Sequence, residues 1–543
     1  MSGEKSINVY SRKDFLKLGG LSLLLTYLSA CGLIPKKKQI PVSFAGSNSK
    51  RGHLLRSGSF PEPSSNIQIN TLIVGGGVAG LSAAWQFKQQ SFSDWLLLEL
   101  DDSVGGNSKS GKNAVCEYPY GAHYLPIPNE NFSDLINFLK QNQIITGFDA
   151  KGLPIYNEYY LCAEPQERLF FKGIWHEGIP PKSGLTTLEQ KELSQFLKTA
   201  NQFKHEVGSD GKPAFALPLE WSSLDDKFLQ LDKISMQAYL KQEGYKTEFL
   251  LWYINYCCKD DFGTDIKNLS AWAGLHYFAS RNGKSANAES YEQLTWPEGN
   301  NFLVKCLSKD LKSQLKPKQL VYKIEPNGKY WKCYVLDFNT NQSACYNCEN
   351  LILATPQFVN KRLLNFTNDL NFMEFEYYPW LVANVTINKA LDLNGNSDLS
   401  WDNVIFGSKS LGYVNSCHQI HHQKQQKTVI TYYYNFSEQS PKLERQSIYQ
   451  KDENYWKQFI IKDLSQAHSN IEELVEEIEV YVYGHGMISP AVGFKTSETR
   501  QNLAKGLDNL YFINSDVSGI SVFEQAFYNG ITAAKKVLGV HGA

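Results

Sequence analysis

The residues best placed to do chemistry are three glycines, Gly75, Gly77 and Gly80, which follow an apolar run that ends at Val74. Their G-x-G-x-x-G spacing is typical of a turn that binds a dinucleotide. The first glycine permits the tight turn, the second lets the backbone approach a pyrophosphate, and the third brings the following helix close to the strand. The amides at the start of that helix would face the anion. The glycines therefore predict a nucleotide-binding site, although this spacing alone also occurs in ordinary turns.

A carboxylate stands where such a site needs one. Residues 95–98 form a second apolar run, and Glu99 follows it. An acid about 20 residues after the glycines is the group that holds ribose hydroxyls in a dinucleotide fold, and it would repel a 2′-phosphate. Both apolar runs are typical of buried parallel strands. The predicted fold class is therefore α/β, with a Rossmann-type nucleotide-binding domain.

A second glycine motif, residues 105–108, follows Glu99 and Leu100. An acid at a strand end followed by Gly-Gly-x-Ser resembles the FAD-binding amine oxidase, protoporphyrinogen oxidase and phytoene desaturase superfamily. In that superfamily the loop covers the pyrophosphate and the ribityl chain of the flavin. The resemblance also implies that residues 121–124 run under the isoalloxazine ring, where His123 is either a ring contact or a structural histidine.

Later segments extend this resemblance. Residues 350–353 form an apolar strand that closes on Ala-Thr-Pro, and residues 509–516 form a strand that ends in an acid before a helix. The superfamily uses this last element to close the FAD site, so its presence favours FAD over NAD. The resemblance assigns the following residues to the cofactor: Gly75, Gly77, Val78, Ala79, Gly80, Glu99, Leu100, Gly105, Gly106, Asn107, Ser108, Gly121, Ala122, His123, Tyr124, Val321 through its backbone to the adenine, Ala354, Thr355, Pro356, Ser515, Asp516, Phe523 and Ala526.

The chain departs from the pattern of this superfamily at two positions. Val522 stands where many amine oxidases have a tyrosine of the aromatic cage, which argues against a primary-amine cage. No cysteine follows Cys417, so the flavin thioether of some relatives has no candidate. We therefore expect FAD to be bound non-covalently.

The substrate pocket is expected to draw on the divergent middle of the chain. Residues 270–281 combine aromatics, a histidine and an arginine, and fit a pocket wall or a packed core helix equally well. Of the tyrosines at 432–434, only some can face a flavin, because alternate side chains of a strand point to opposite faces. Tyr483 and His485 precede the last nucleotide segment and are the predicted catalytic residues.

These assignments predict a Rossmann-type FAD-binding domain with an inserted α+β substrate domain. A helix is expected within residues 231–240, with Asp232 or Ser235 as its N-cap before an apolar face at Met236, Tyr239 and Leu240. The expected boundaries are 1–30 for an export signal, 31–65 for a tether, 66–125, 300–365 and 491–543 for the FAD-binding domain, and 126–299 and 366–490 for the substrate domain.

The N-terminal residues are typical of an export signal. A basic stretch precedes an apolar run, residues 18–30, that is too short to span a bilayer as a mature helix. Arg12 and Lys13 resemble the twin-arginine motif with one arginine replaced, so Sec export stays open. Residues 28–31 resemble a lipobox, which predicts lipid on Cys31 and a membrane-tethered protein on the periplasmic side of a bacterial envelope. An uncleaved apolar anchor is the alternative.

The net charge and the spacing of histidines and cysteines give no support for nucleic-acid or metal binding. The 543 residues carry a net charge of −1, which gives no support for nucleic-acid binding. His418, His421 and His422 offer metal-like spacing without a clear third ligand, so loop histidines in solvent are expected. Cys345 and Cys348 form a single C-x-x-C without a second pair, expected in a strand connection, which argues against zinc and leaves a disulfide open. No metal site is expected.

The resemblance implies a flavin oxidoreductase. A small organic substrate, an amine among the candidates, would transfer hydride to flavin N5, and the electrons would pass to oxygen or a membrane carrier. One alternative is a desaturase or isomerase of a lipid or polyene, favoured by the tether and by Val522. Another is a flavin-binding lipoprotein without turnover.

Overall fold

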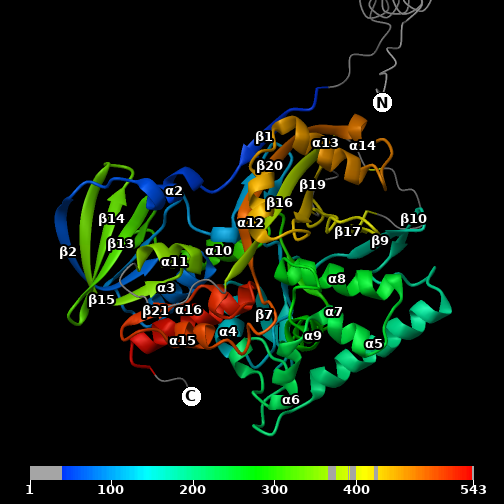
Figure 1. Cartoon of the computed structure of the whole chain (residues 1–543), viewed down its shortest axis with the longest axis horizontal. Coiled ribbons are helices and arrows are strands. Elements are labelled where there is room, and N and C mark those ends of the chain that lie inside the picture. The colour runs from blue at the N-terminus through cyan, green and yellow to red at the C-terminus, as the bar shows by residue number, and fades with distance from the viewer. Residues whose placement is uncertain (1–38, 365–374, 389–390, 392–398, 421–425, 541–543) are drawn as a thin grey trace, which may run out of the picture. The chain divides into compact units, whose positions relative to one another are not determined.

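A computed structural model describes residues 39–364, 375–388, 391, 399–420 and 426–540. Two compact units divide the chain, Met1–Pro41 and Val42–Ala543, and every described helix and strand lies in the second. Figure 1 shows this second unit as two lobes, each built on its own β-sheet. Among the described residues, every helix is too short or too polar to span a bilayer.

The nucleotide lobe is built on a seven-stranded sheet whose strands come from three separated parts of the chain. Strands β3, β2, β15 and β21 pair in parallel. Parallel sheets are covered on both faces, which fits the apolar residues of these strands. In spatial order the strands are β12 (Leu315–Lys316), β3 (Trp95–Leu98), β2 (Pro63–Val74), β15 (Gln342–Leu353), β14 (Tyr330–Asp337) and β13 (Gln319–Asn327), with β21 (Leu510–Phe512) paired to β15.

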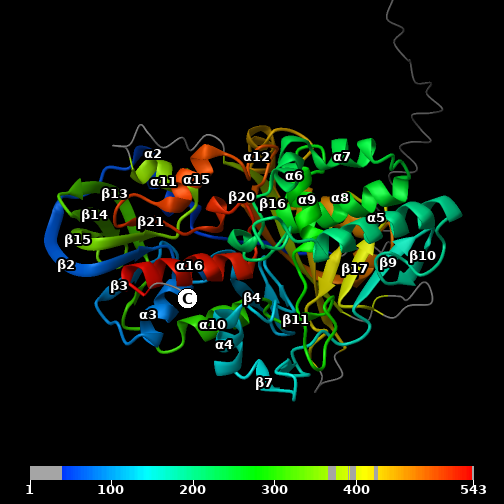
Figure 2. The ribbon, with the colours of Figure 1, turned by 90° about the horizontal axis from the view of Figure 1, so that it is seen from below.

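Two helices from opposite ends of the sequence pack together on this sheet. They are α3 (Val78–Gln89) and α16 (Phe523–Val537), which lie side by side in Figure 2. Their contact is close, because a Cβ on Gly530 would lie 2.2 Å from the carbonyl oxygen of Ala79. The first and last segments of the nucleotide lobe therefore meet at one place. The other helices of this lobe are α2 (Ser49–Ser57), α4 (Ser133–Gln141), α10 (Asn301–Ser308), α11 (Gln357–Leu363) and α15 (Glu498–Lys505).

The substrate lobe is built on a mixed eight-stranded sheet, on the right in Figure 1. Its strands in spatial order are β1 (Val42–Ala45), β20 (Val475–Ser489), β16 (Glu376–Ile387), β19 (Thr428–Asn435), β18 (Tyr413–Asn415), β17 (Asp402–Ile405), β9 (Glu167–Phe171) and β10 (Ile174–Glu177). Its helices are α5 (Thr187–His205), α6 (Asp226–Leu229), α7 (Met236–Gln242), α8 (Glu248–Phe262), α9 (Ala271–Ala279), α12 (Pro441–Ile448), α13 (Glu453–Leu464) and α14 (Ile471–Leu474). Short two-stranded pairs are β4 (Ser110–Lys112) with β5 (Glu117–Pro119), β6 (Tyr124–Pro126) with β11 (Gln293–Thr295), and β7 (Ile145–Phe148) with β8 (Pro154–Tyr156).

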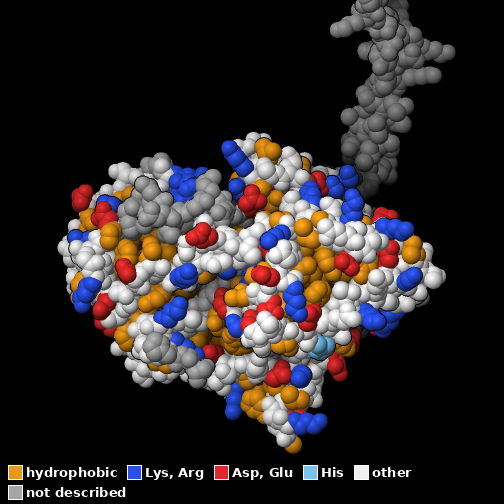
Figure 3. Space-filling model, turned by 60° about the horizontal axis from the view of Figure 1, so that its bottom comes forward, with side chains coloured by type: hydrophobic (Ala, Val, Ile, Leu, Met, Phe, Trp, Pro, Cys, Tyr) orange, Lys and Arg blue, Asp and Glu red, His pale blue; other side chains and the backbone are white. Residues whose placement is uncertain are grey.

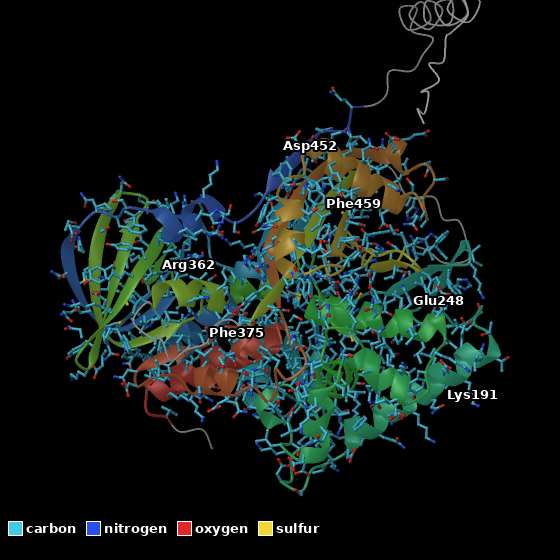
Figure 4. All side chains as sticks on the ribbon, in the orientation of Figure 1. Lys191, Glu248, Arg362, Phe375, Asp452 and Phe459 are labelled. Carbon is cyan, nitrogen blue, oxygen red and sulfur yellow. The ribbon has the colours of Figure 1, made fainter. Side chains whose placement is uncertain are left out.

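Helix α8 runs from the outside of the substrate lobe toward its interior. Figure 4 shows Glu248, at the start of α8, and Lys191, on α5, at the outer side of the lobe. The residues near the other end of α8 are buried, among them Cys257 and Cys258. Figure 3 shows acidic and basic side chains interspersed over one face, in keeping with the near-zero net charge.

The architecture confirms the predicted fold class, a Rossmann-type domain with a second domain. The expected cap of α7 is Ser235, whose hydroxyl accepts a hydrogen bond from the amide of Ala238 at 3.2 Å. Asp232, the alternative, bonds instead to Ser270.

Two expectations are wrong. Residues 31–65 are not a tether throughout, because part of this range is folded onto the rest of the chain. Strand β1 pairs in parallel with β20, and the amide of Asn48, the N-cap of α2, donates a 2.8 Å hydrogen bond to the carboxylate of Asp101. Cys345 and Cys348 lie inside β15 and not in a connection. Their odd spacing along a strand points them to opposite faces, which excludes a disulfide between them.

Candidate functional site

The glycine turn has the geometry of a phosphate cradle. Gly75 has a φ of +105°, which favours glycine, and its amide donates to the carbonyl of Leu98 at 2.8 Å. A Cβ on Gly80 would lie 2.0 Å from the carbonyl oxygen of Gly75, so this glycine permits the close packing of α3 on the turn. A Cβ on Gly77 would meet nothing closer than the Cα of Gly106 at 4.0 Å. The space beside Gly77 and the first amides of α3 therefore suit a pyrophosphate.

Glu99 lies at the end of β3, beside this cradle. Its carboxylate accepts hydrogen bonds from the amides of Gly76 at 2.7 Å and Asp101 at 2.8 Å. Burial raises the pKa of Glu99, and the Lys109 charge opposes that shift. The carboxylate thus has a fixed orientation at the carboxyl end of the strand, where a ribose would lie.

The second glycine motif closes over the first. The amide of Gly105 donates to the carbonyl of Gly76 at 2.7 Å, and a 3₁₀ turn covers Gly106–Ser108. Asn107 reaches across to the substrate lobe, where its side-chain amide donates to the carbonyl of Gly486 at 2.8 Å. The sequence-predicted cofactor residues from Gly75 to Ser108 are therefore brought together around one cradle.

The later predicted cofactor segments lie at or near the same edge. The amide of Ala354 donates to the carbonyl of Val74 at 2.8 Å, which places the residues after β15 against the glycine turn. Val321 is buried on β13, the last strand of the sheet. Asp516 accepts hydrogen bonds from the amide of Gln357 at 2.9 Å and from the hydroxyl of Tyr377. The proposed contacts of Val321 with adenine and of Asp516 with the ribityl chain stay predictions.

A cavity of about 140 Å³ lies between the two lobes, beyond the cradle. Two segments that the resemblance assigns to the flavin ring border it, residues 121–124 and the start of α16 at Phe523 and Glu524. We call it the first cavity. The substrate lobe contributes Trp380, Val382, Tyr433, Tyr483, Gly486 and Met487.

Polar atoms in the wall of the first cavity lack partners. Among the described residues, Trp380 Nε1 and Asn300 Oδ1 are buried without a hydrogen-bond partner. Such groups are costly unless a ligand or water satisfies them. The cradle, the oriented acid and this cavity together fit FAD, whose ring would occupy the first cavity and would supply the hydride acceptor.

The structure separates the two predicted catalytic residues. Tyr483 lines the first cavity, and its hydroxyl donates to the carbonyl of Tyr120 at 2.9 Å. His485 does not line it and instead stacks on Phe358, with ring centroids 4.1 Å apart. The assignment of His485 to the pocket is therefore wrong.

A β-bulge explains why His485 points away. Strand β20 advances from Tyr483 to Met487 while β16 advances only from Trp380 to Tyr378. The extra residues break the alternation of side chains that would have placed His485 on the cavity side.

A second cavity of about 110 Å³ adjoins the first and shares four of its wall residues, His123, Tyr124, Asp260 and Tyr433. His123 stacks on Tyr433 with ring centroids 4.7 Å apart, and its Nδ1–H donates to the carbonyl of Gly121 at 3.2 Å. Burial lowers the pKa of His123 to about 4, so this ring is neutral at pH 7. The predicted flavin segment thus forms part of the partition between the cavities.

Three carboxylates face the second cavity: Glu167, Asp260 and Asp402. Glu167 on β9 and Asp402 on β17 are directly paired across parallel strands, an arrangement of like charges that disfavours the sheet. Asp402 accepts a hydrogen bond from the hydroxyl of Tyr256, and Asp260 accepts one from Tyr124, each at 3.1 Å. Tyr253, Tyr277 and Trp401 complete an aromatic wall.

The three acids are protonated more readily than exposed carboxyls. Desolvation raises the pKa of Glu167 to about 7, with the amide of Ile179 opposing the shift. Desolvation and the Asp261 charge raise the pKa of Asp260 to about 7. Desolvation and the Glu167 charge raise the pKa of Asp402 well above its usual range. A cation in the second cavity would relieve this strain.

No described basic side chain forms an ion pair with these three acids. Arg281, which lines the first cavity together with Asp260, pairs instead with Asp261 at 3.2 Å and with Glu524 at 4.0 Å. Among the described residues no group of three ligands could hold a metal ion. The second cavity therefore offers an aromatic and acidic wall that suits an organic cation.

Sequence reasoning missed these acids. Asp260 is one of two adjacent acids near the end of the largely apolar helix α8, which was an available signal. The sequence around Glu167 and Asp402 gave no such signal, because these two residues lie close together only through the pairing of β9 with β17. Residues 270–281 prove to be mainly core, with His276 bonded to the carbonyl of Ala216, although Arg281 reaches the first cavity. Of the tyrosine run, Tyr433 lines both cavities.

Comparisons with known proteins agree with this fold. Residues 73–141 match a family model described as an NAD(P)-binding Rossmann-like domain. A flavin-containing amine oxidase of Oncorhynchus mykiss is 20% identical over 309 residues, covering 54% of this chain and 51% of that protein. The chain thus matches about half the length of this curated relative.

Solved structures extend the likeness to most of the chain. Putrescine oxidase bound to putrescine superposes with a TM-score of 0.62 at 12% identity, over 87% of this chain and 100% of that one. A fatty acid isomerase from P. acnes superposes with a TM-score of 0.60 at 14% identity, over 86% and 98%. The fold is that of the flavin-containing amine oxidases and related flavoproteins. Because this fold serves both an amine oxidase and a lipid isomerase, the substrate must be argued from the site.

Proposed function

We propose that the protein is an FAD-dependent oxidoreductase that oxidises an amine carrying a second cationic group. The single observation that carries this proposal is the second cavity, where Glu167, Asp260 and Asp402 line a wall without a described basic partner. An alkyl diamine with one ammonium group among these acids would reach toward the partition with the first cavity. Putrescine, the ligand of a structurally similar oxidase, has this chemistry, and with Val522 in place of an aromatic cage residue the acids of the second cavity would bind its ammonium group.

The chain's own residues would bind and orient both partners. The cradle and Glu99 would hold the nucleotide, and FAD, when bound non-covalently, would accept a hydride from the substrate. Asp260, at the partition, would accept a proton at its carboxylate from the incoming ammonium, because its pKa of about 7 lies close to neutral pH. The tyrosine and tryptophan rings of the second cavity would exclude water and stabilise the distal cation.

The acids argue against the alternative substrates. A lipid or polyene would place apolar groups against three carboxylates, which costs free energy with no compensating charge. The proposed electron acceptor is oxygen or a membrane carrier.

Anaerobic reduction of the bound flavin tests the proposal. Purified protein is mixed with putrescine or with butylamine, which has the same chain length and one amino group. We expect putrescine to bleach the flavin absorbance with an apparent Kd at least about 10-fold lower, since one charge-assisted interaction is worth about 1.5–3 kcal/mol. Equal response to both amines would contradict the dication proposal, and no reduction by either would favour a lipid substrate or a flavin-binding protein without turnover.

Matched variants test whether the acids of the second cavity cause the preference for putrescine over butylamine. Glu167→Gln and Asp402→Asn should each reduce the preference for putrescine over butylamine. Glu177→Gln is the control, because Glu177 lies nearby on β10 but pairs with Lys182 at the surface. A loss of preference in the control would show that the acids of the second cavity are not its source.

We also propose that the protein is exported and tethered through lipid on Cys31, on the periplasmic side of a bacterial envelope. The support is the lipobox-like sequence at residues 28–31, which lies outside the described residues. Cys31→Ser in the full chain should abolish incorporation of labelled fatty acid and release the protein from membranes. Retention of the variant in the membrane fraction would instead favour the uncleaved anchor.

A further inference from the structure

The thiols of Cys116 and Cys417 lie 2.9 Å apart, sulfur to sulfur, although 301 positions separate them in the sequence. Cys116 lies in the turn between β4 and β5, and Cys417 follows β18. The separation is within about 1 Å of a disulfide bond length of about 2.05 Å. The mechanism described above uses neither residue.

We propose that Cys116 and Cys417 form an intramolecular disulfide that joins the β4–β5 turn to the substrate lobe. Both cysteines are held at this contact by neighbouring side chains. The amide of Cys116 donates to Asn113 Oδ1 at 3.3 Å, and the amide of Cys417 donates to Asn415 Oδ1 at 3.1 Å. Asn113 also donates to Thr386 on β16 at 2.9 Å, which anchors the turn to the substrate sheet. Bond formation then requires little backbone movement.

The two thiols differ in reactivity. The hydrogen bond with Cys116 lowers the pKa of Cys417 to about 7, helped by the amide of Val429 and the hydroxyl of Thr428. The same contact and burial raise the pKa of Cys116. Cys417 is the partly exposed member of the pair and Cys116 is the buried one. Cys417 is therefore the attacking thiolate and Cys116 the resolving thiol.

A small disulfide would serve as the oxidant. The Cys417 thiolate attacks one sulfur of the oxidant, which forms a mixed disulfide and releases one thiolate. Cys116 then loses its proton and attacks Sγ of Cys417, which forms the protein disulfide and releases the second thiolate. Two protein thiols lose two electrons in total, and the oxidant disulfide is reduced to two thiols. The export to the bacterial envelope that is proposed above would place the protein in an oxidising compartment, which favours the disulfide between Cys116 and Cys417.

The other close cysteines offer a contrast. Cys333 and Cys348 lie on neighbouring strands of the nucleotide lobe, and both are 0% exposed. A soluble oxidant cannot reach them in the folded protein, so this pair is expected to stay reduced. Cys306 on α10 is partly exposed but lies in another part of the nucleotide lobe.

The disulfide would reinforce the contact of Tyr120 and Gly121, at the start of the predicted flavin segment, with the substrate sheet. The turn bearing Cys116 leads through β5 to Tyr120 and Gly121. The hydroxyls of Tyr483 and Tyr433, from the substrate sheet, donate to the carbonyls of these two residues at 2.9 and 3.0 Å. A covalent link one strand away would hold the two sides of this contact together.

Peptide mapping of the full-length flavoprotein tests the proposal. Protein treated with glutathione disulfide is alkylated in denaturant and digested without reduction. We expect a cross-linked peptide that contains Cys116 and Cys417, and two fewer alkylated cysteines than after dithiothreitol. Cys116→Ser and Cys417→Ser should each abolish this peptide, while Cys306→Ser should retain it.

Two outcomes would overturn the proposal. One is the absence of the cross-linked peptide from oxidised protein that retains its flavin absorbance. The other is pairing of Cys116 or Cys417 with a different cysteine. A second measurement examines the link itself: dithiothreitol should lower the unfolding midpoint of oxidised wild type by about 5 °C or more, and should leave Cys417→Ser unchanged. An equal effect on both proteins would contradict a link at this position.

Discussion

Tyr124 donates its phenolic O–H to Oδ2 of Asp260 across 3.1 Å, which joins the segment under the expected flavin ring to the inner end of α8. Both residues belong to the walls of both cavities. An acid held by a single hydroxyl at this partition has oxygen atoms left for a ligand. The pair therefore marks the point where a cationic substrate would meet the flavin.

Replacing Asp260 with asparagine should lower kcat/KM for putrescine by about 10- to 100-fold, because a charge-assisted hydrogen bond is lost while the side-chain volume is kept. Tyr124→Phe should cause a smaller loss, since it removes only the orienting hydroxyl. Steady-state kinetics with each amine measure the effect. An Asp260→Asn enzyme with unchanged kcat/KM would exclude Asp260 from substrate binding.

The acid cluster should make stability fall as pH rises. The pKa of Glu167 is raised from 4.5 to about 7, so its carboxyl binds a proton more tightly in the folded state than in the unfolded state. Its contribution is present in full below pH 4.5 and is lost as pH rises through about 7, by up to about 3 kcal/mol. Glu167→Gln should flatten this part of the profile, as chemical denaturation of the flavin-free protein at pH 5 and pH 8 would reveal. A parallel decline in wild type and variant would rule out Glu167 as the cause.

Part of this site could be predicted from sequence, because part of it follows local rules. The glycine turn, Glu99 and the closing helix α16 each depend on residues adjacent in the chain, and the structure brings them together. Glu167 and Asp402 lie far apart in sequence and meet only through strand pairing, which no local pattern specifies. The bulge that turns His485 away likewise depends on the register of β20 against β16.

The glycine turn offers a test that separates folding from cofactor binding. Gly77→Ala should fold normally, because its added Cβ meets no described atom closer than 4.0 Å, yet it should bind FAD at least about 10-fold more weakly, since that Cβ would meet the pyrophosphate. Gly80→Ala should lose folded protein, because its Cβ would lie 2.0 Å from a backbone oxygen. Circular dichroism and flavin titration distinguish the two defects. Full flavin occupancy in Gly77→Ala would place the pyrophosphate elsewhere.

Tyr483 and His485 should differ in their effects on activity. Tyr483→Phe removes the hydroxyl that holds the carbonyl of Tyr120, next to the flavin segment, and should slow anaerobic flavin reduction several-fold. His485→Leu keeps an apolar contact with Phe358 and should leave the reduction rate within about two-fold. Burial lowers the pKa of His485 to about 3, so its ring is neutral across the working pH range and contributes no limb to the pH–rate profile. If His485→Leu instead removed an ionisation from that profile while retaining flavin, the bulge would not orient this histidine away from the reacting groups as the structure has it.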